Sequence, residues 1–296
     1  LSTLQRVLVV GSNLRKDHPL FALRVRHAVR HGAHRQLDLL IDLVRRATGI
    51  LARTIRVFCF DQCTLLVAAD HCIEQGKDPL SGPLRLGAIY TVSPYLLPYL
   101  IPLLRQRAPQ MQLLLEENYT SRLAEMLKQG EIDVAVLSEP FREPGIVTQA
   151  VYDEPFRVLI PADHAWSAEK AIAAQQLAEA QLLLLGAGNC FRDQVLEVCP
   201  MCRNGDGLQR TLEGSSLETI RHMVATGAGI TVLPSTAADR IPATNTLLAV
   251  RPFADPEPSR RIALAWRVTY PRSGAIDVIR AAILGSHLPG VRPVGH

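Results

Sequence analysis

The sequence predicts an α/β protein whose main part has two lobes around a cleft. After residue 84, short apolar runs alternate with helical patterns, as is typical of parallel sheets covered by helices on both faces. The pattern forms two blocks, 84–150 and 153–250, and the chain returns with a further strand near residue 260. Small ligands bind at the carboxyl ends of such strands, so we expect a ligand in the cleft.

The first block follows this alternation closely. Residues 84–89 predict a strand and residues 93–109 a helix, in which Pro94 is tolerated near the start. Pro98 and Pro102 predict that this helix is irregular. The block continues with a strand at 112–117, a helix from 120 that ends at Gly130, and a strand at 133–138.

The second block has the same rhythm. Apolar runs predict strands at 156–161, 181–186 and 230–234. Helical patterns lie at 171–180, 190–198 and 216–229. The returning segment predicts a strand at 260–267 and a last helix near 275–284.

Composition bounds the class of protein. The 296 residues suffice for two domains, and 48% hydrophobic with 20% charged residues suits a globular core. No apolar stretch reaches 18 residues and no signal-peptide pattern begins the chain, so we expect no membrane association. Six cysteines in a chain of this length do not make a disulfide scaffold, and we expect a reducing cytoplasm.

Charge divides the chain unevenly. Residues 1–76 contain 11 Lys/Arg and 6 Asp/Glu, a net +5, whereas the remainder contains 21 and 22, a net −1. The basic front part fits either contact with nucleic acid or an ordinary solvated arginine-rich surface. Residues 76–83, GKDPLSGP, form the clearest linker.

Two cysteines stand nine positions apart on the predicted helix at 190–198. Asn189 is a good N-cap, which places Cys190 in the first turn, where the helix terminus and nearby Arg192 favour a reactive thiolate. Nine helical residues rise about 13.5 Å, whereas a disulfide needs Cα atoms within about 7 Å. Cys199 can therefore trap an oxidised Cys190 only if the helix unwinds. The alternative is that both are ordinary buried thiols.

Cofactor motifs are sparse. Cys199 also begins the C-x-x-C segment CPMC, which is of redox or zinc type, but no second such pair accompanies it. The sequence has no dinucleotide fingerprint, P-loop or G-x-S-x-G. We expect no cofactor and no metal.

Three segments carry a family resemblance: GKDPLSGPLRLGAIYTVSPY, GNCFRDQVLEVC and SSLETIRHMVATGAGITVLP. Residues 76–285 resemble the regulatory domain of the LysR-type transcriptional regulators, in their peroxide-sensing branch. The resemblance implies two Rossmann-like lobes of periplasmic-binding-protein type over 84–296, which dimerise. Lobe I is then expected over about 84–152 and 257–296, and lobe II over about 153–256.

The resemblance also implies roles for single residues. Cys190 matches the thiol that hydrogen peroxide oxidises, and Cys199 the thiol that resolves it into a disulfide. Thr91 and Thr120 match threonines that line the peroxide pocket, although ordinary loop or cap hydroxyls are the alternative. Asn189 stands where many relatives carry histidine. Two further matched positions, which hold the reduced loop, are Arg192 and Asp193.

The front segment departs from that family. Residues 1–75 lack a recognisable winged helix-turn-helix, and 6–33 resemble a fragment of one component of NADH-quinone oxidoreductase. By family, the partners are hydrogen peroxide, a second copy in a dimer or tetramer, promoter DNA and RNA polymerase. Two other functions stay open: a thiol peroxidase or oxidoreductase using Cys190, Cys199 and Cys202, and a LysR-type domain that binds a small organic effector.

Overall fold

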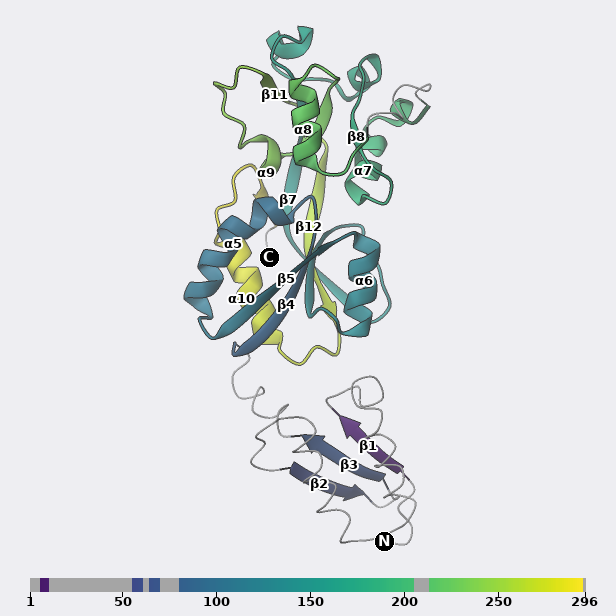
Figure 1. The fold of residues 1–296 in the computed structure, drawn as a ribbon, viewed down its shortest axis with the longest axis vertical. Helices are drawn as coiled ribbons and strands as arrows, with labels where there is room; N and C mark the ends of the chain where they lie inside the picture. Colours follow the sequence, from purple (N-terminus) through teal and green to yellow (C-terminus); the bar gives the residue numbers. More distant parts are fainter. Residues whose placement is uncertain (1–5, 11–54, 61–63, 70–79, 205–212, 295–296) are drawn as a thin grey trace. The chain divides into compact units, whose positions relative to one another are not determined.

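The computed structural model describes residues 6–10, 55–60, 64–69, 80–204 and 213–294. The chain divides into two units, Leu1–Pro79 and Leu80–His296, with the boundary inside the segment predicted as a linker (Figure 1). In the first unit, β1 (Arg6–Val10) pairs parallel with β3 (Thr64–Ala69), and β2 (Ile55–Phe60) pairs antiparallel with β3. The rest of residues 1–75, on which the question of a DNA-binding motif depends, lies outside the described residues.

Lobe I of the second unit contains a mixed sheet in the order β5-β4-β6-β12-β7. Its strands are β4 (Gly82–Ile89), β5 (Met111–Asn118), β6 (Val134–Ser138), β7 (Ile146–Pro161) and β12 (Ser259–Arg267). β4 is parallel to β5 and β6, but β12 runs antiparallel to β6 and β7. The expectation of parallel sheets is therefore confirmed for β4, β5 and β6 but was wrong for β7 and β12, because the returning strand β12 inserts antiparallel between β6 and β7.

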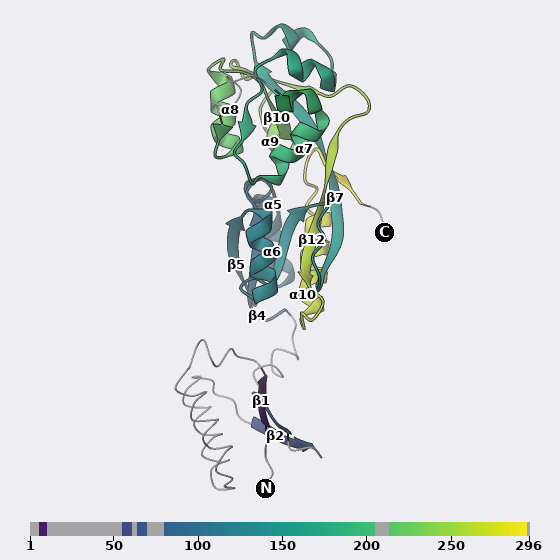
Figure 2. The ribbon, with the colours of Figure 1, turned by 90° about the vertical axis from the view of Figure 1, so that its right-hand side faces the viewer.

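Three helices cover the lobe I sheet. α5 (Ser93–Arg107) and α10 (Ser273–Leu284) lie together on one side and α6 (Thr120–Gln129) on the other (Figures 1 and 2). Pro98 and Pro102 lie inside α5 without ending it. Gly130 ends α6 as predicted, in a left-handed conformation (φ 75°) that glycine adopts without strain.

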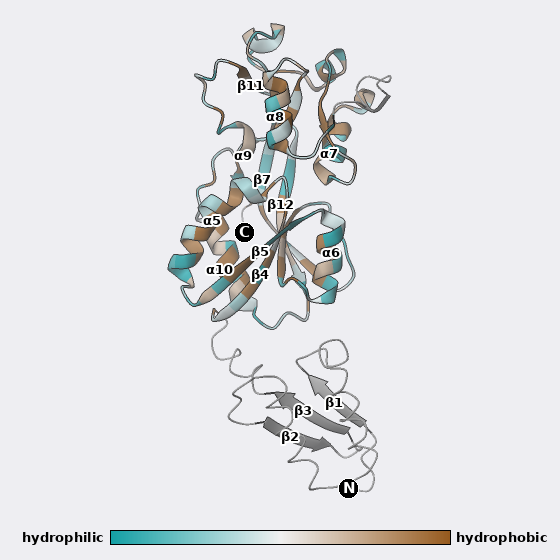
Figure 3. Cartoon of the chain, viewed as in Figure 1, coloured by the Kyte–Doolittle hydropathy of each residue, from teal (hydrophilic) through white to brown (hydrophobic). Residues whose placement is uncertain are grey.

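Lobe II is built around the second half of β7. There β10 (Thr231–Pro234) and β11 (Leu248–Pro252) pair antiparallel with it, and β8 (Leu184–Leu185) pairs parallel with β9 (Glu213–Gly214). The α-helices are α7 (Cys190–Val198), α8 (Leu217–Ala225) and α9 (Ser235–Ala238). Short 3-10 helices are η1 (Ala165–Ala168), η2 (Ala174–Glu179) and η3 (Pro200–Asn204). α6 and α8 carry both hydrophobic and hydrophilic residues, as helices with one buried face do (Figure 3).

The helix predicted at 171–180 was mostly wrong. Its residues are favourable for a helix, yet only η2 forms, because the backbone of Ile172 is engaged elsewhere. The Ile172 N–H donates to Pro252 O at 3.0 Å, and the Ala254 N–H donates to Ile172 O at 2.9 Å. This bridge to the end of β11 removes the first turn, and a helix as short as the remainder is marginal on its own. The strand predicted at 181–186 is likewise reduced to β8, with an isolated bridge at Leu182.

Two separate hydrophobic cores define the lobes. One contains buried residues of β4, α5, α6, β6, β12 and α10, and the other contains residues of the second half of β7, α7, α8 and β10. β7 runs through both: Pro155 pairs with Ser259 of β12, and the next residue, Phe156, pairs with Pro234 of β10. A short terminal strand, β13 (Arg292–Pro293), also pairs with β7. The described helices include none with the length and apolar character needed to cross a bilayer.

Candidate functional site

Cys190 begins α7 at the boundary between the two lobes. Asn189 precedes it as the N-cap, in an extended conformation (φ −80°, ψ 118°), so the predicted cap position is correct. The buried Asn189 side chain, however, makes no capping hydrogen bond. Cys190 is a free, partly exposed cysteine that packs against the lobe I core, whereas its neighbour Phe191 belongs to the lobe II core. The thiol therefore lies where the lobes meet.

Arg260 connects Phe191 to Thr91. Its guanidinium carbon lies 4.9 Å from the centroid of the Phe191 ring. Nη1 donates to Thr91 Oγ1 at 2.7 Å, and Nη2 donates to Thr91 O at 3.0 Å. Thr91 itself is buried, between β4 and α5. One arginine of β12 thus holds a predicted pocket threonine close to the first turn of α7.

A carboxylate balances the charge of Arg260. Arg260 Nε donates to Glu154 Oε2 at 2.7 Å, and both side chains are fully excluded from solvent. The other Glu154 oxygen accepts from the hydroxyl of Thr236 and from its N–H at 3.3 Å. A buried ion pair is tolerated only when additional hydrogen bonds satisfy both groups, as here. Sequence reasoning missed this pair; the only available signal was a double arginine at the head of an apolar strand, residues 260–267.

Thr120, the first residue of α6, carries an unusual hydroxyl. Its Oγ1 is buried and has no hydrogen-bond partner in the part of the chain that the structure describes. Buried polar atoms are nearly always paired, so an unpaired one requires an explanation such as a bound small molecule. Since no hydrogen bond of the described residues joins Thr120 to Cys190, its predicted place in a peroxide pocket stays a prediction.

The residues after Cys190 face different parts of the molecule. Arg192 Nη1 donates to Leu185 O and to Glu213 Oε1, both at 2.7 Å. Its guanidinium therefore binds the paired strands β8 and β9. Asp193 is exposed. Gln194, which sequence reasoning did not single out, reaches lobe I: its Nε2 donates to Ser138 Oγ at 2.8 Å. α7 is therefore fastened to both lobes by two side chains that are two positions apart.

The other end of α7 holds two bonded cysteines. Cys199 is the C-cap residue, and its sulfur forms a disulfide with Cys202 of η3, with the Cα atoms 5.5 Å apart. Cys199 is 2% exposed and Cys202 is 7% exposed. The structure thus leaves Cys190 as a free thiol at one end of the helix and joins Cys199 to Cys202 at the other. The predicted Cys190–Cys199 disulfide is not formed in this state and stays a prediction.

A second contact joins the lobes away from α7. Tyr95 of α5 packs in the lobe II core, and its hydroxyl donates to Glu218 Oε1 of α8 at 3.0 Å. Arg240 Nη2 donates to Tyr95 O at 2.6 Å. Burial, and after it the nearby Glu218 carboxylate, raises the pKa of Tyr95 above its ordinary value of 10.0.

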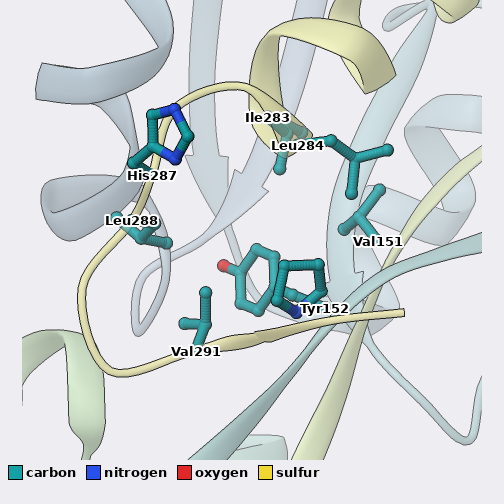
Figure 4. A pocket seen from close by; sticks show the side chains of 8 residues that line it. Val151, Tyr152, Ile283, Leu284, His287, Leu288 and Val291 are labelled. Atoms are coloured by element: carbon teal, nitrogen blue, oxygen red, sulfur yellow. The ribbon is translucent and has the colours of Figure 1, made fainter. Parts of the chain in front are cut away.

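A cavity among the described residues lies elsewhere. It has a volume of about 310 Å³ and is formed by β7, the end of α10 and the segment that follows (Figure 4). Its lining is Val151, Tyr152, Ile283, Leu284, His287, Leu288, Val291 and Pro293. None of these is a predicted site residue. Among the described residues, no group of three His, Cys, Asp or Glu side chains is arranged to hold a metal ion.

Comparison with known proteins identifies the domain. Residues 77–286 match the model of the LysR substrate binding domain. A "Probable hydrogen peroxide-inducible genes activator" of Streptomyces viridosporus is 37% identical over 205 residues, which span 69% of this chain and 65% of that relative. A "Hydrogen peroxide-inducible genes activator" of Pectobacterium carotovorum subsp. carotovorum is 34% identical, over 81% of this chain and 82% of the relative.

A solved structure agrees with these relatives. The reduced form of OxyR from N. meningitidis is 47% identical to this chain and superposes with a TM-score of 0.68, over 73% of this chain and all of that one. The resemblance predicted for residues 76–285 is confirmed. The resemblance of residues 6–33 to a component of NADH-quinone oxidoreductase is not borne out.

Proposed function

Because this chain belongs to the LysR substrate-binding-domain family, and within it to the hydrogen peroxide-inducible activators, we propose that it senses hydrogen peroxide through Cys190 and regulates transcription. The observation that carries the proposal is the position of Cys190. It is a free, partly exposed thiol in the first turn of a helix, at the junction of the lobes. The thiolate is the form of cysteine that attacks peroxide.

The first step is a two-electron oxidation of one sulfur. The Cys190 thiolate attacks one peroxide oxygen, the S–O bond forms, the O–O bond breaks, and hydroxide leaves and is protonated to water. Cys190 becomes a sulfenic acid. Each such oxidation consumes one peroxide and leaves Cys190 oxidised, so the protein acts as a sensor and not as an enzyme with turnover.

Thr91 and Thr120 are the groups proposed to bind peroxide beside Cys190. Thr91 Oγ1 accepts a hydrogen bond from Arg260, so its own proton is directed elsewhere and is available to donate to an oxygen. The Thr120 hydroxyl is buried without a partner among the described residues, and peroxide both donates and accepts hydrogen bonds. Asn189 is buried beside the thiol and has an amide that can both donate and accept.

The second step is disulfide formation between Cys190 and Cys199, which changes the structure of α7. The thiolate of Cys199, when it is free, attacks the Cys190 sulfenic sulfur, and hydroxide leaves as the disulfide forms. Because the two cysteines lie at opposite ends of α7, about 13.5 Å of helix must unwind. Unwinding breaks the contacts of Arg192 with lobe II and of Gln194 with lobe I, so the relation between the lobes changes.

The regulatory output involves partners outside the site. We propose that the chain acts as a homodimer, or a tetramer, on promoter DNA together with RNA polymerase, in the cytoplasm where that DNA lies. The name of the Pectobacterium relative, an activator of genes, supports a role in transcription. Most of residues 1–75, in which the sequence shows no recognisable winged helix-turn-helix, lie outside the described residues.

Thr120→Val tests the site with little structural risk. Valine keeps the shape and removes a hydroxyl that has no partner among the described residues, so stability should not fall. We expect the rate of sulfenic acid formation at Cys190, measured by dimedone trapping, to fall by about tenfold. This is the effect of losing one hydrogen bond of about 1.4 kcal/mol. Thr226→Val, at an exposed threonine of lobe II, is the matched control and should react like the wild type.

Three results would contradict parts of this proposal. A Cys190 that stays inert to peroxide would refute the sensor. An unchanged rate in Thr120→Val would remove that hydroxyl from the peroxide site. Repeated consumption of peroxide in the presence of a thiol reductant would favour a thiol peroxidase instead.

A further inference from the structure

Cys202 lies close to Cys199, the cysteine with which an oxidised Cys190 is proposed to form a disulfide. Cys199 ends α7, Pro200 begins η3, and the Cys202 N–H donates to Cys199 O at 3.0 Å. This tight turn brings the two Cα atoms to 5.5 Å, within the range that a disulfide requires. Cys199 and Cys202 are therefore bonded without any change in α7.

A Cys190–Cys199 disulfide requires a much larger change of the fold than a Cys199–Cys202 disulfide. Cys190 and Cys199 are separated by the whole of α7, and joining them breaks the helix. Phe191 and Val195, both 2% exposed, would leave the lobe II core, and the edge-to-face contact of Phe191 with Phe156 would be lost. A Cys190–Cys199 disulfide is accordingly held in an unfolded segment, whereas the Cys199–Cys202 disulfide is compatible with a folded one.

We propose that Cys202 is a third reacting residue, which competes with Cys190 for Cys199 and so makes the peroxide-induced disulfide transient. The proposal rests on the proposed function for the origin of the first disulfide. Once α7 has unwound and Cys190 and Cys199 are joined, the Cys202 thiolate attacks the sulfur of Cys199. A Cys199–Cys202 bond forms, the Cys190–Cys199 bond breaks, and Cys190 leaves as a thiolate. The exchange consumes no oxidant or reductant.

Two consequences follow for the oxidised protein. α7 can refold, because its two ends are no longer tied together. Cys190 is again free, but Cys199 is no longer available to resolve it, so a second peroxide leaves Cys190 as an unresolved sulfenic acid. The arrangement of a free Cys190, a folded α7 and a Cys199–Cys202 bond is the one that the structure holds.

Tryptic mapping of the full chain separates the two disulfides directly. Trypsin cleaves after Lys170, Arg192 and Arg203, so Cys190 lies in peptide 171–192, and Cys199 and Cys202 share peptide 193–203. A Cys190–Cys199 bond links two peptides, whereas a Cys199–Cys202 bond lies within one. The reduced chain is given one equivalent of peroxide without external thiol, quenched at intervals, alkylated and digested.

The wild type should show linked peptides first and then the internal bond, with Cys190 again open to alkylation. In Cys202→Ser the linked peptides should persist at least about tenfold longer, because a neighbouring thiol acts at an effective concentration in the millimolar range or above. Met201→Ser is the matched control: Met201 lies between the two cysteines, is 70% exposed, and its replacement should leave the exchange unchanged.

Diamide, which couples thiols without peroxide, keeps this test independent of the sensor function. It should give the Cys199–Cys202 bond in the wild type and in Cys190→Ser, and the Cys190–Cys199 bond in Cys202→Ser. The same Cys190–Cys199 product in wild type and Cys202→Ser would overturn the proposal, as would a Cys202 that stays open to alkylation. If peroxide fails to oxidise Cys190 but diamide gives the expected pattern, only the proposed function fails.

Discussion

The two ends of α7 differ in what surrounds their cysteines. At the N-terminal end, Cys190 is a single free thiol, partly exposed, with the lobe I core on one side and Phe191 in lobe II on the other. At the C-terminal end, Cys199 and Cys202 are bonded and buried within lobe II alone. The first environment leaves its cysteine partly exposed, whereas the second shields its two cysteines from solvent while the helix is folded.

The comparison shows that the partly exposed thiol, Cys190, and the cysteine proposed to form a disulfide with it, Cys199, lie at opposite ends of one helix. The first half of α7 is fixed by polar contacts to both lobes, through Arg192 and Gln194. An oxidised Cys190 can form a disulfide with Cys199 only if these contacts break. In the proposed function, oxidation of Cys190 thereby leads to a rearrangement between the lobes. Each of the following predictions alters one side of this comparison.

Arg260→Ala should have the largest effect, because it leaves Glu154 as an unpaired buried charge beneath the N-terminal end of α7. We expect the free energy of unfolding of the full chain to fall by about 3–5 kcal/mol in urea titration. The next residue supplies the control. Arg261 of β12 forms a solvent-accessible ion pair with Asp153 of β7, and Arg261→Ala should have little measurable effect. Equal losses in the two variants would show that the buried network does not support this end.

Gln194→Ala should have an intermediate effect, because it releases α7 from Ser138 without touching either core. Stability should fall by about 0.5–1.5 kcal/mol. Because the contact is lost when α7 unwinds, the Cys190–Cys199 disulfide should form about 2- to 10-fold faster, as followed by quenched alkylation. Glu197→Ala, at an exposed position of the same helix, should leave this rate unchanged. A slower rate in Gln194→Ala would contradict the requirement for unwinding.

Tyr95→Phe should have the smallest effect on the redox site, since Tyr95 joins the lobes away from α7. The pKa of Tyr95 is raised in the folded protein, chiefly by burial, so the folded state keeps this proton when the unfolded state loses it. Stability must then decline as pH rises above about 10. Urea titrations across that range should show a shallower decline in Tyr95→Phe, with Cys190 oxidation at neutral pH unaltered. A changed rate of oxidation would mean that the two lobe contacts are coupled.

The sequence predicts those features of the fold and the site that depend on neighbouring residues, and it misses those that depend on residues distant in the chain. α7 and the cap position of Asn189 follow from neighbouring residues and were predicted correctly. The antiparallel insertion of β12 and the bridge at Ile172 depend on partners distant in the chain, which periodicity does not reveal. The Arg260–Glu154 pair was missed for the same reason: the residues are 106 positions apart. Cys202 was visible only as half of a C-x-x-C, and its pairing required the turn that Pro200 begins.

The central claim is that Cys190 is the thiol that reacts with peroxide, and differential alkylation tests it most directly. The reduced full chain is treated briefly with one equivalent of hydrogen peroxide, alkylated, digested and compared with an untreated sample. The account predicts that Cys190 is the first cysteine to lose alkylation and that peptides 171–192 and 193–203 become linked at early times. A Cys190 that remains fully alkylated while peroxide is present would contradict it.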